Sequence, residues 1–475
     1  MSGIAVEGSR MTEIVERALA SSSADGCVVI GEERTEANLR WAANSLTTNG
    51  QMRSRKLCVI SILNGPDGAR SGVVSGPVTG ADLAAEVDEL VRRSEAAARA
   101  ATTAEDASEL VAPYPNSDDW QAPAGSTSIE VFTDFAPALG RAFAAARTDG
   151  TLLYGFAGHI LSSMFLATST GVRRRFDQPT GRIELNGKSA DLSRSAWVGK
   201  QTRDFSDIDV DALTADLARR LAWSRNRIEL PAGRYETLLP PTAVADLMLN
   251  VYFGASARDA EEGRSVFSAT GGGTRLGETL SPLPINLFSD PERAGMQCPS
   301  FEITPMSGFE SVFDNGAPVA ATDWIRAGKL ANLHRNRNWA ARTGTGQVPL
   351  VDNLIMSVEP SAGAAAGKSL DEMIASTARG LLVTCLWYIR EVDPQTMLLT
   401  GLTRDGVYLI EDGEVVGVVN NFRFNESPVD LLGRITEVGL TEPTLPREWS
   451  DYFSRAAMPA VRVPDFNMST VSQAS

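Results

Sequence analysis

Histidine and cysteine are the scarcest reactive residues of this 475-residue chain. The two histidines, His159 and His334, lie too far apart to face one ion from a single helical turn, as the histidines of zinc peptidases commonly do. The four cysteines are also widely separated, and no two of them form a Cys-x-x-Cys pair. This spacing excludes a zinc ribbon and a redox dithiol, and it predicts reduced, buried thiols.

The chain also has fewer basic than acidic residues, and it has no long apolar run. Lys and Arg total 44 against 59 Asp and Glu, so the net charge is −15, which disfavours binding to nucleic acid. No apolar run approaches the ~18 residues of a transmembrane helix. The N-terminus lacks the basic and apolar regions of a signal peptide, so we expect a cytoplasmic protein. With 43% hydrophobic and 22% charged residues, the chain has the composition of a folded globular protein.

The order of hydrophobic patterns predicts an α+β fold. N-terminal α/β sandwich-type layers are followed by a β-rich C-terminal domain with mixed strands and helices. We divide the chain into an N-terminal α+β domain at 1–105, a central strand and helix region packed with it at 106–230, and a β-rich domain at 231–475.

Local signals predict individual elements. Apolar residues at helical spacing indicate a helix over Met11–Ser21. Apolar runs predict separate strands at 27–30 and 37–44, and two more separate strands at 151–157 and 162–169. A helix at 243–253 is expected to begin with Thr242 as its N-cap. The turn Asp412-Gly413 between two apolar runs predicts a hairpin.

Two glycine-rich segments approach phosphate-binding patterns without meeting them. Residues 363–369 (Gly-Ala-Ala-Ala-Gly-Lys-Ser) have one residue too few between the first glycine and the Gly-Lys pair of a Walker loop. Residues 271–277 are not followed by the helix that a dinucleotide-binding turn needs. We interpret the first segment as a strand-to-helix connection with Ser369 as helix N-cap, and the second as a flexible loop.

The residues by themselves supply no catalytic constellation. There is no Gly-x-Ser-x-Gly elbow, and His159 lies between apolar neighbours, which is typical of a structural histidine. His334 lies in a basic run at 326–342, for which anion binding, a solvated loop and an interface with an acidic partner all remain open. We therefore assign no catalytic, cofactor-binding or metal-binding residue.

Four segments occur along the chain in an order that suggests a family. The first is the layout of two strand regions at 39–48 and 57–74 before a helix at 81–101. The others are 154–171, which ends in Thr-Ser-Thr-Gly; 238–247 with 263–267 and Asp290-Pro291; and 379–384 with 403–414 and 421–427. In this order they resemble the TldD/PmbA family, also called TldD/TldE, of two-subunit zinc peptidases. The resemblance covers about residues 25–465.

The resemblance implies one of two kinds of subunit. The TldD kind carries a His-Glu-x-x-x-His helix whose histidines, with a later cysteine, hold the catalytic zinc, and the TldE (PmbA) kind lacks it. The corresponding helix here is 243–253, with Ala245, Asp246 and Leu247 in its middle, and no His-Glu pair occurs in the sequence. The chain therefore resembles the TldE kind, and zinc is expected in a TldD-like partner rather than in this chain.

Two functions follow as hypotheses. The first is a non-catalytic subunit that forms a heterodimer with a TldD-like, zinc-bearing subunit and shapes the chamber for unfolded or extended peptides, including the maturation of a peptide-derived product. It expects no direct nucleic-acid partner and no membrane. The alternative is a stand-alone biosynthetic enzyme or small-molecule binder on the same scaffold, with its site at Cys385, beside Trp387 and Tyr388, or at the basic run 326–342.

Overall fold

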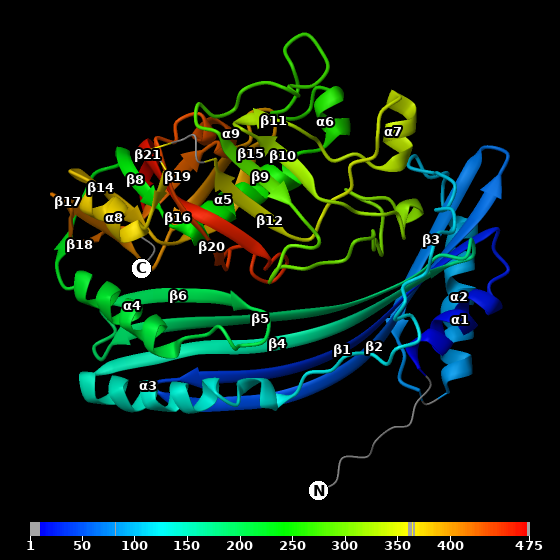
Figure 1. The fold of residues 1–475 in the computed structure, drawn as a ribbon, viewed down its shortest axis with the longest axis horizontal. Helices are drawn as coiled ribbons and strands as arrows, with labels where there is room; N and C mark the ends of the chain where they lie inside the picture. Colours follow the sequence, from blue (N-terminus) through cyan, green and yellow to red (C-terminus); the bar gives the residue numbers. More distant parts are fainter. Residues whose placement is uncertain (1–9, 81, 360–362, 364–365, 473–475) are drawn as a thin grey trace, which may run out of the picture.

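Two β-sheets, one N-terminal and one C-terminal, organise the chain in the computed structural model (Figure 1). The structure describes residues 10–80, 82–359, 363 and 366–472. Within these ranges the N-terminal sheet is antiparallel, and its six strands are, in spatial order, β3 (Gly68–Pro77), β2 (Ser45–Gly65), β1 (Gly26–Ala42), β4 (Thr151–Thr168), β5 (Arg173–Ser189) and β6 (Ser195–Thr202). The regions at 1–105 and 106–230 thus contribute strands to one sheet.

The strands of this sheet are longer than the local pattern predicts. Residues 27–30 and 37–44 are not separate strands, because β1 runs without a break from Gly26 to Ala42, and 151–157 and 162–169 are likewise joined in β4. The polar residues between the two apolar runs of β1 stay in the strand because alternate side chains point to opposite faces. Buried Glu33, for example, is paired with Arg53 and, at 3.0 Å, with Arg55 of β2.

Helices cover one face of the N-terminal sheet (Figure 1). They are α1 (Met11–Ser21) and α2 (Leu83–Ala100) toward one end, and a 3-10 turn, η1 (Ile129–Phe132), with α3 (Phe135–Asp149) and α4 (Val210–Trp223) toward the other. Odd-numbered residues of β1, such as Val29 and Leu39, pack with these helices. The helix predicted at Met11–Ser21 is confirmed at both ends.

The C-terminal half of the chain lies on the opposite face of the same sheet. Even-numbered residues of β1, including Val28 and Ile30, pack there with Phe301 and Phe313. The sheet is therefore sandwiched between helices and the C-terminal domain, as the predicted layers require. The α+β fold class is confirmed.

The C-terminal sheet is mixed and, in the part of the chain that is described, has 15 strands. Its main path runs β11 (Lys329–Leu330), β10 (Thr322–Arg326), β9 (Ile285–Ser289), β12 (Leu354–Val358), β21 (Ala456–Val471), β8 (Gly233–Leu239), β14 (Arg379–Val383), β17 (Val407–Glu411), β18 (Glu414–Val419) and β7 (Arg227–Ile228). The remaining strands are β13 (Ala366–Lys368), β15 (Leu386–Asp393), β16 (Leu398–Thr403), β19 (Phe422–Glu426) and β20 (Glu437–Thr444). The predicted hairpin is confirmed as β17–β18, with Asp412 and Gly413 at positive φ.

Helix α5 (Pro241–Gly254) lies in the core of this domain. Residues all round its circumference are buried, which is typical of a core helix. The predicted cap at Thr242 is wrong: Pro240 is the N-cap, and the Thr242 hydroxyl donates instead to the Leu445 carbonyl at 2.6 Å. The shorter helices are α6 (Ala257–Glu261), η2 (Val312–Asp314), α7 (Arg337–Thr343), α8 (Leu370–Ala375) and α9 (Pro428–Leu432). Across the described residues, no helix has the length and apolar character needed to cross a membrane.

Candidate functional site

Helix α5 carries a buried carboxyl group, Asp246, in the segment where the family resemblance places the zinc motif. Its Oδ1 accepts the backbone N–H of Glu448 at 2.9 Å, and its Oδ2 has no hydrogen-bond partner among the described residues. Asp246 has no exposed surface, and this burial raises its pKa well above the usual value. Burial therefore favours the protonated carboxyl group over the carboxylate.

The guanidinium of Arg447 lies beside Asp246 and ties three parts of the molecule together. It donates to Sγ of Cys385 and, at 2.9 Å, to Oδ2 of Asp405. It also lies against two indole rings, 4.7 Å from the ring centroid of Trp197 in β6 and 5.0 Å from that of Trp387 in β15. Only a planar cation can make both the forked hydrogen bonds and the ring contacts.

This donor set does not fit a catalytic zinc ion. Zinc needs neutral imidazoles, thiolates or carboxylates that converge on one point, and a guanidinium that is always protonated lies between the groups that could approach it. Burial raises the pKa of Cys385 to about 12, so the thiol stays protonated at neutral pH. No group of three His, Cys, Asp or Glu side chains among the described residues is arranged to hold a metal.

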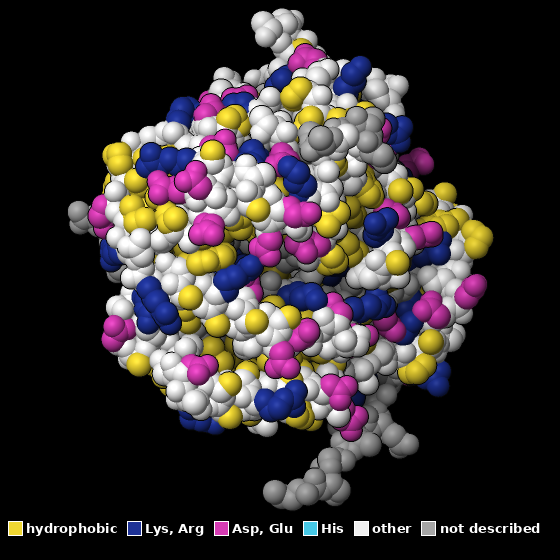
Figure 2. Space-filling view, turned by 60° about the vertical axis from the view of Figure 1, so that its left-hand side comes forward, with side chains coloured by type: hydrophobic (Ala, Val, Ile, Leu, Met, Phe, Trp, Pro, Cys, Tyr) yellow, Lys and Arg dark blue, Asp and Glu magenta, His cyan; other side chains and the backbone are white. Residues whose placement is uncertain are grey.

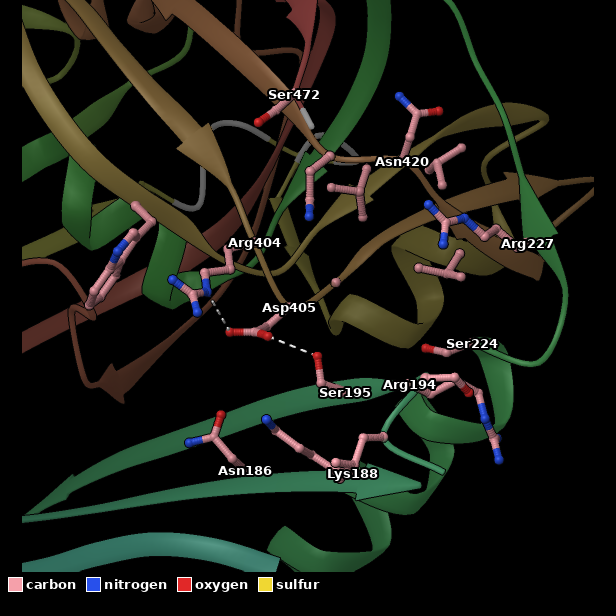
Figure 3. Close-up of a pocket in the computed structure, with 18 of the residues that line it drawn as sticks. Asn186, Lys188, Arg194, Ser195, Ser224, Arg227, Arg404, Asp405, Asn420 and Ser472 are labelled. Carbon is pink, nitrogen blue, oxygen red and sulfur yellow. Dashed lines mark hydrogen bonds and ion pairs between the residues drawn. The ribbon is translucent and has the colours of Figure 1, made fainter. Parts of the chain in front are cut away.

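A pocket of about 740 Å³ opens on the outer side of this cluster, between the N-terminal sheet and the C-terminal domain (Figure 3). Asn186 and Lys188 reach it from β5, while Arg404 and Asp405 face them from the loop before β17. Asp405 joins the two sides because it also accepts the hydroxyl of Ser195 at 3.0 Å. Arg447 and Trp387 belong both to the pocket wall and to the buried cluster.

The pocket is strongly basic. Five of the described side chains that line it are cationic and one is a carboxylate, although the whole chain has a net charge of −15. Figure 2 shows Lys and Arg side chains gathered along the hollow between the two halves of the molecule. The arrangement suits an anionic ligand.

The sequence candidate Cys385 lies in this region, whereas the two histidines do not line the pocket. His159 in β4 is held between the Thr127 hydroxyl and the Arg203 carbonyl, each at 2.7 Å, and burial lowers its pKa. Burial also lowers the pKa of His334 to about 4. The imidazole of His334 is therefore neutral at physiological pH, and His159 has the structural position that the sequence indicates.

The basic run 326–342 is divided among several ion pairs. Arg335 bonds Glu261 at 2.7 Å, Arg337 bonds Asp314 at 2.7 Å, and Arg326 pairs with Asp323. The guanidinium of Arg342 lies 5.2 Å from the ring centroid of Trp339. The run therefore holds surface elements in place and does not form one anion-binding face.

The two glycine-rich segments have structural roles where they are described. Ser369 is the N-cap of α8 in a capping box with Glu372, as predicted, and Lys368 pairs with Glu437 at 2.5 Å. Residues 364 and 365 of that segment lie outside the described residues. Residues 271–273 form a turn of three glycines at positive φ, and no helix follows it directly.

Sequence reasoning did not identify the pocket. Its charged residues come from β5, from the loop before β6, from β7, from the segment at 404–405 and from position 447, and no motif links these positions. The nearest signal was Cys385 with Trp387, which the sequence offered for the alternative function. Only the packing of the N-terminal sheet against the C-terminal domain brings the charged residues of the pocket together.

Comparisons with known proteins address the family directly. The family model described as PmbA/TldA metallopeptidase C-terminal domain matches residues 232–470, just over half of the chain. A search of curated proteins finds no significant match.

Solved structures share the fold over nearly the full length. TldE from Thermococcus kodakarensis has a TM-score of 0.76 at 15% identity, covering 96% of this chain and 99% of that one. A putative modulator of DNA gyrase from Bacteroides thetaiotaomicron has a TM-score of 0.73 at 12% identity, covering 97% of this chain and 98% of that one. Another putative modulator of DNA gyrase, from Thermotoga maritima, has a TM-score of 0.71 at 16% identity, covering 96% of this chain and 99% of that one. On the match of the family model, this chain belongs to the PmbA/TldD metallopeptidase family.

Proposed function

We propose that this chain is a non-catalytic, TldE-like subunit of a two-subunit zinc peptidase. The observation that carries the proposal is the environment of α5. Fully buried Asp246 and the guanidinium of Arg447 lie in the region where the family resemblance places the zinc ligands and the general base of a catalytic subunit. The full-length fold similarity to TldE from Thermococcus kodakarensis supports the same assignment.

In this proposal the zinc and the catalytic residues belong to a TldD-like partner. The two subunits form a heterodimer in the cytoplasm that cleaves unfolded or extended peptides, with this chain shaping the chamber that admits them. Nucleic acid and membrane have no direct part in it.

A free strand edge supports the idea of a partner subunit. β3 pairs with β2 only from Lys56 onward, so the outer edge of β2 from 45 to 54 has no neighbouring strand in the part of the chain that the structure describes. Side chains along this edge are exposed, including Leu46 (53%) and Met52 (55%). Unpaired backbone groups on an edge bind other strands readily, and we assign this edge to the zinc-bearing partner.

The test is co-purification from the native extract. The tagged chain is isolated, its partners are identified by mass spectrometry, and zinc is quantified in the same eluate. The proposal expects a stoichiometric partner with a His-Glu-x-x-x-His motif and zinc that leaves with that partner when the complex is separated. A chain that emerges alone, or that keeps zinc after separation, contradicts it.

A further inference from the structure

Asp405, the one carboxylate among the described residues that line the interdomain pocket, already has several partners. Asp405 accepts hydrogen bonds from Ser195 and Arg447 at 3.0 and 2.9 Å, and Arg404 Nε lies 3.6 Å from it. These contacts leave Asp405 with little capacity to neutralise further cations. The pocket therefore keeps an excess of positive charge after its internal ion pairs are counted.

Other donors of the pocket wall have no acceptor among the described residues. Lys188 Nζ lies 5.6 Å from the ring centroid of Tyr154 and forms no ion pair with a described carboxylate. The indole Nε1 of Trp387 and the amide Nδ2 of Asn420 are buried and have no hydrogen-bond partner within the described part of the chain. Each of these groups is a donor, and buried donors without acceptors are costly unless something else satisfies them.

The shape and lining of the pocket favour an organic anion over an inorganic one. Its volume of about 740 Å³ lies in the range that holds small organic ligands. Apolar side chains, among them Leu192, Val407 and Val418, also line it. An inorganic ion would leave these surfaces without a contact.

We infer that this pocket binds a carboxylate of an extended peptide, with Lys188 and Arg404 as its cationic contacts. They lie on opposite sides of the pocket, Lys188 on β5 and Arg404 in the C-terminal domain (Figure 3). The inference rests on the proposed function for the choice of a peptide, and it gives this chain a role in holding the substrate. The carboxylate belongs either to the C-terminus of the peptide or to an acidic side chain.

The experiment is isothermal titration of the purified chain, without any partner, at low salt. Three acetylated pentapeptides serve as probes: Ala-Ala-Val-Ala-Ala with a free C-terminus, the same peptide amidated, and amidated Ala-Ala-Glu-Ala-Ala. Inorganic phosphate is the fourth ligand. The variants are Lys188→Met and Arg404→Gln, and the control is Lys329→Met, an exposed lysine of β11 outside the pocket.

We expect binding of at least one carboxylate peptide over the amidated neutral peptide. Each pocket variant should weaken it about tenfold or more, the range for a hydrogen bond to a charged group, while Lys329→Met leaves it unchanged. The probe that binds identifies the source of the carboxylate. Equal binding of the neutral peptide, binding unaffected by both pocket variants, binding of phosphate alone, or no binding at all would overturn the inference.

The failure of this inference is separable from failure of the proposed function. Co-purification of Lys188→Met with the zinc-bearing partner tests assembly without using the pocket. If the variant assembles normally but the wild-type chain binds no carboxylate peptide, the pocket assignment falls and the subunit assignment stands.

Discussion

At the scale of single residues, Arg447 is the side chain on which the account depends most. It is only 10% exposed, and it satisfies both a 14% exposed carboxylate, Asp405, and the thiol of Cys385. Removing one member of a buried ion pair leaves the other charge without compensation, which costs more than the pair itself contributes.

Replacing this arginine should therefore destabilise the chain. We expect Arg447→Met to lower the free energy of unfolding by about 3 kcal/mol, because Asp405 loses its closer cation and keeps only the longer ion pair with Arg404 and the Ser195 hydroxyl. Urea unfolding measures the change. The matched control is Arg379→Met, whose partner Glu411 lies at 3.4 Å on an exposed pair, and which should cost less than about 1 kcal/mol. Equal effects of the two substitutions would contradict the central position given to Arg447.

Buried carboxyl groups make stability depend on pH in an unusual direction. Burial, with the nearby charges of Asp314 and Glu310, raises the pKa of Glu302 from 4.5 to about 9. The folded chain thus holds a proton that the unfolded chain releases above pH 4.5. The stabilisation is complete below that value and is lost as the pH rises toward 9.

The substitution Glu302→Gln removes this titration while keeping a neutral polar group. Between pH 5 and pH 9 the free energy of unfolding of the wild type should fall relative to that of the variant, by up to about 1.4 kcal/mol per pH unit, and its melting temperature should fall with it. Burial also raises the pKa of Glu310, to about 7, and because the charge of Glu310 acts on Glu302, the comparison reports the titration of the two groups together. If the melting temperatures of the two proteins change with pH in parallel across this range, Glu302 is ionised in the folded chain.

At the scale of elements, the contact between α2 and the N-terminal sheet depends on a glycine and a serine. Ser94 of α2 has no exposed surface, and its hydroxyl lies within hydrogen-bond distance of the carbonyls of Val59 and Gly72, at 3.0 and 2.8 Å. A Cβ at Gly72 would overlap the backbone of Ser94 and Ala98. The helix can lie this close only because Gly72 has no side chain.

Two glycine substitutions should therefore act in opposite directions. Gly72→Ala should lower the melting temperature, since α2 must move away from the sheet and lose its hydrogen bonds. Gly140→Ala in α3 meets nothing within 4 Å and should raise stability by up to about 1 kcal/mol through helix propensity. Thermal unfolding followed by circular dichroism compares them, and a neutral Gly72→Ala would show that the contact is looser than described.

The free edge of β2 predicts where substitutions should disrupt binding of the partner subunit. The double substitution Leu46→Lys and Met52→Lys adds charge to an exposed edge, which natural proteins use to prevent strand pairing. We expect it to reduce co-purification of the partner while the melting temperature of the isolated chain stays unchanged. The control is Val392→Lys, another exposed apolar residue on a different strand, at 59% exposure. Unchanged recovery of the partner would place the interface elsewhere.

Local sequence signals predicted elements unevenly, for a physical reason. The helix at Met11–Ser21 was predicted at both ends because its apolar spacing is a local property. Strand β1 was split in two because its middle is charged, and the Arg53 and Arg55 side chains that donate hydrogen bonds to Glu33 there come from another strand. Strand length depended on pairing that a local pattern does not contain.

At the scale of the whole molecule, the order of motifs was more informative than any single motif. Four segments in sequence predicted the family, and the match of the family model over residues 232–470 confirms it. The pocket was not predictable in this way, because Lys188 and Arg404 come to line one pocket only when β5 packs against the C-terminal domain. A basic pocket in a chain of negative net charge is a property of the fold and leaves no local pattern in the sequence.

The most direct test of the subunit assignment is reconstitution of peptidase activity from separately purified chains. This chain, its co-purified zinc-bearing partner and the mixture are each incubated with an unfolded peptide, and cleavage is followed by mass spectrometry. The account predicts full activity in the mixture that is lost when the partner's zinc-binding histidines are replaced by alanine and kept when Cys385→Ala is introduced here. Cleavage by this chain alone, or loss of turnover with Cys385→Ala in a complex that still assembles, would contradict it.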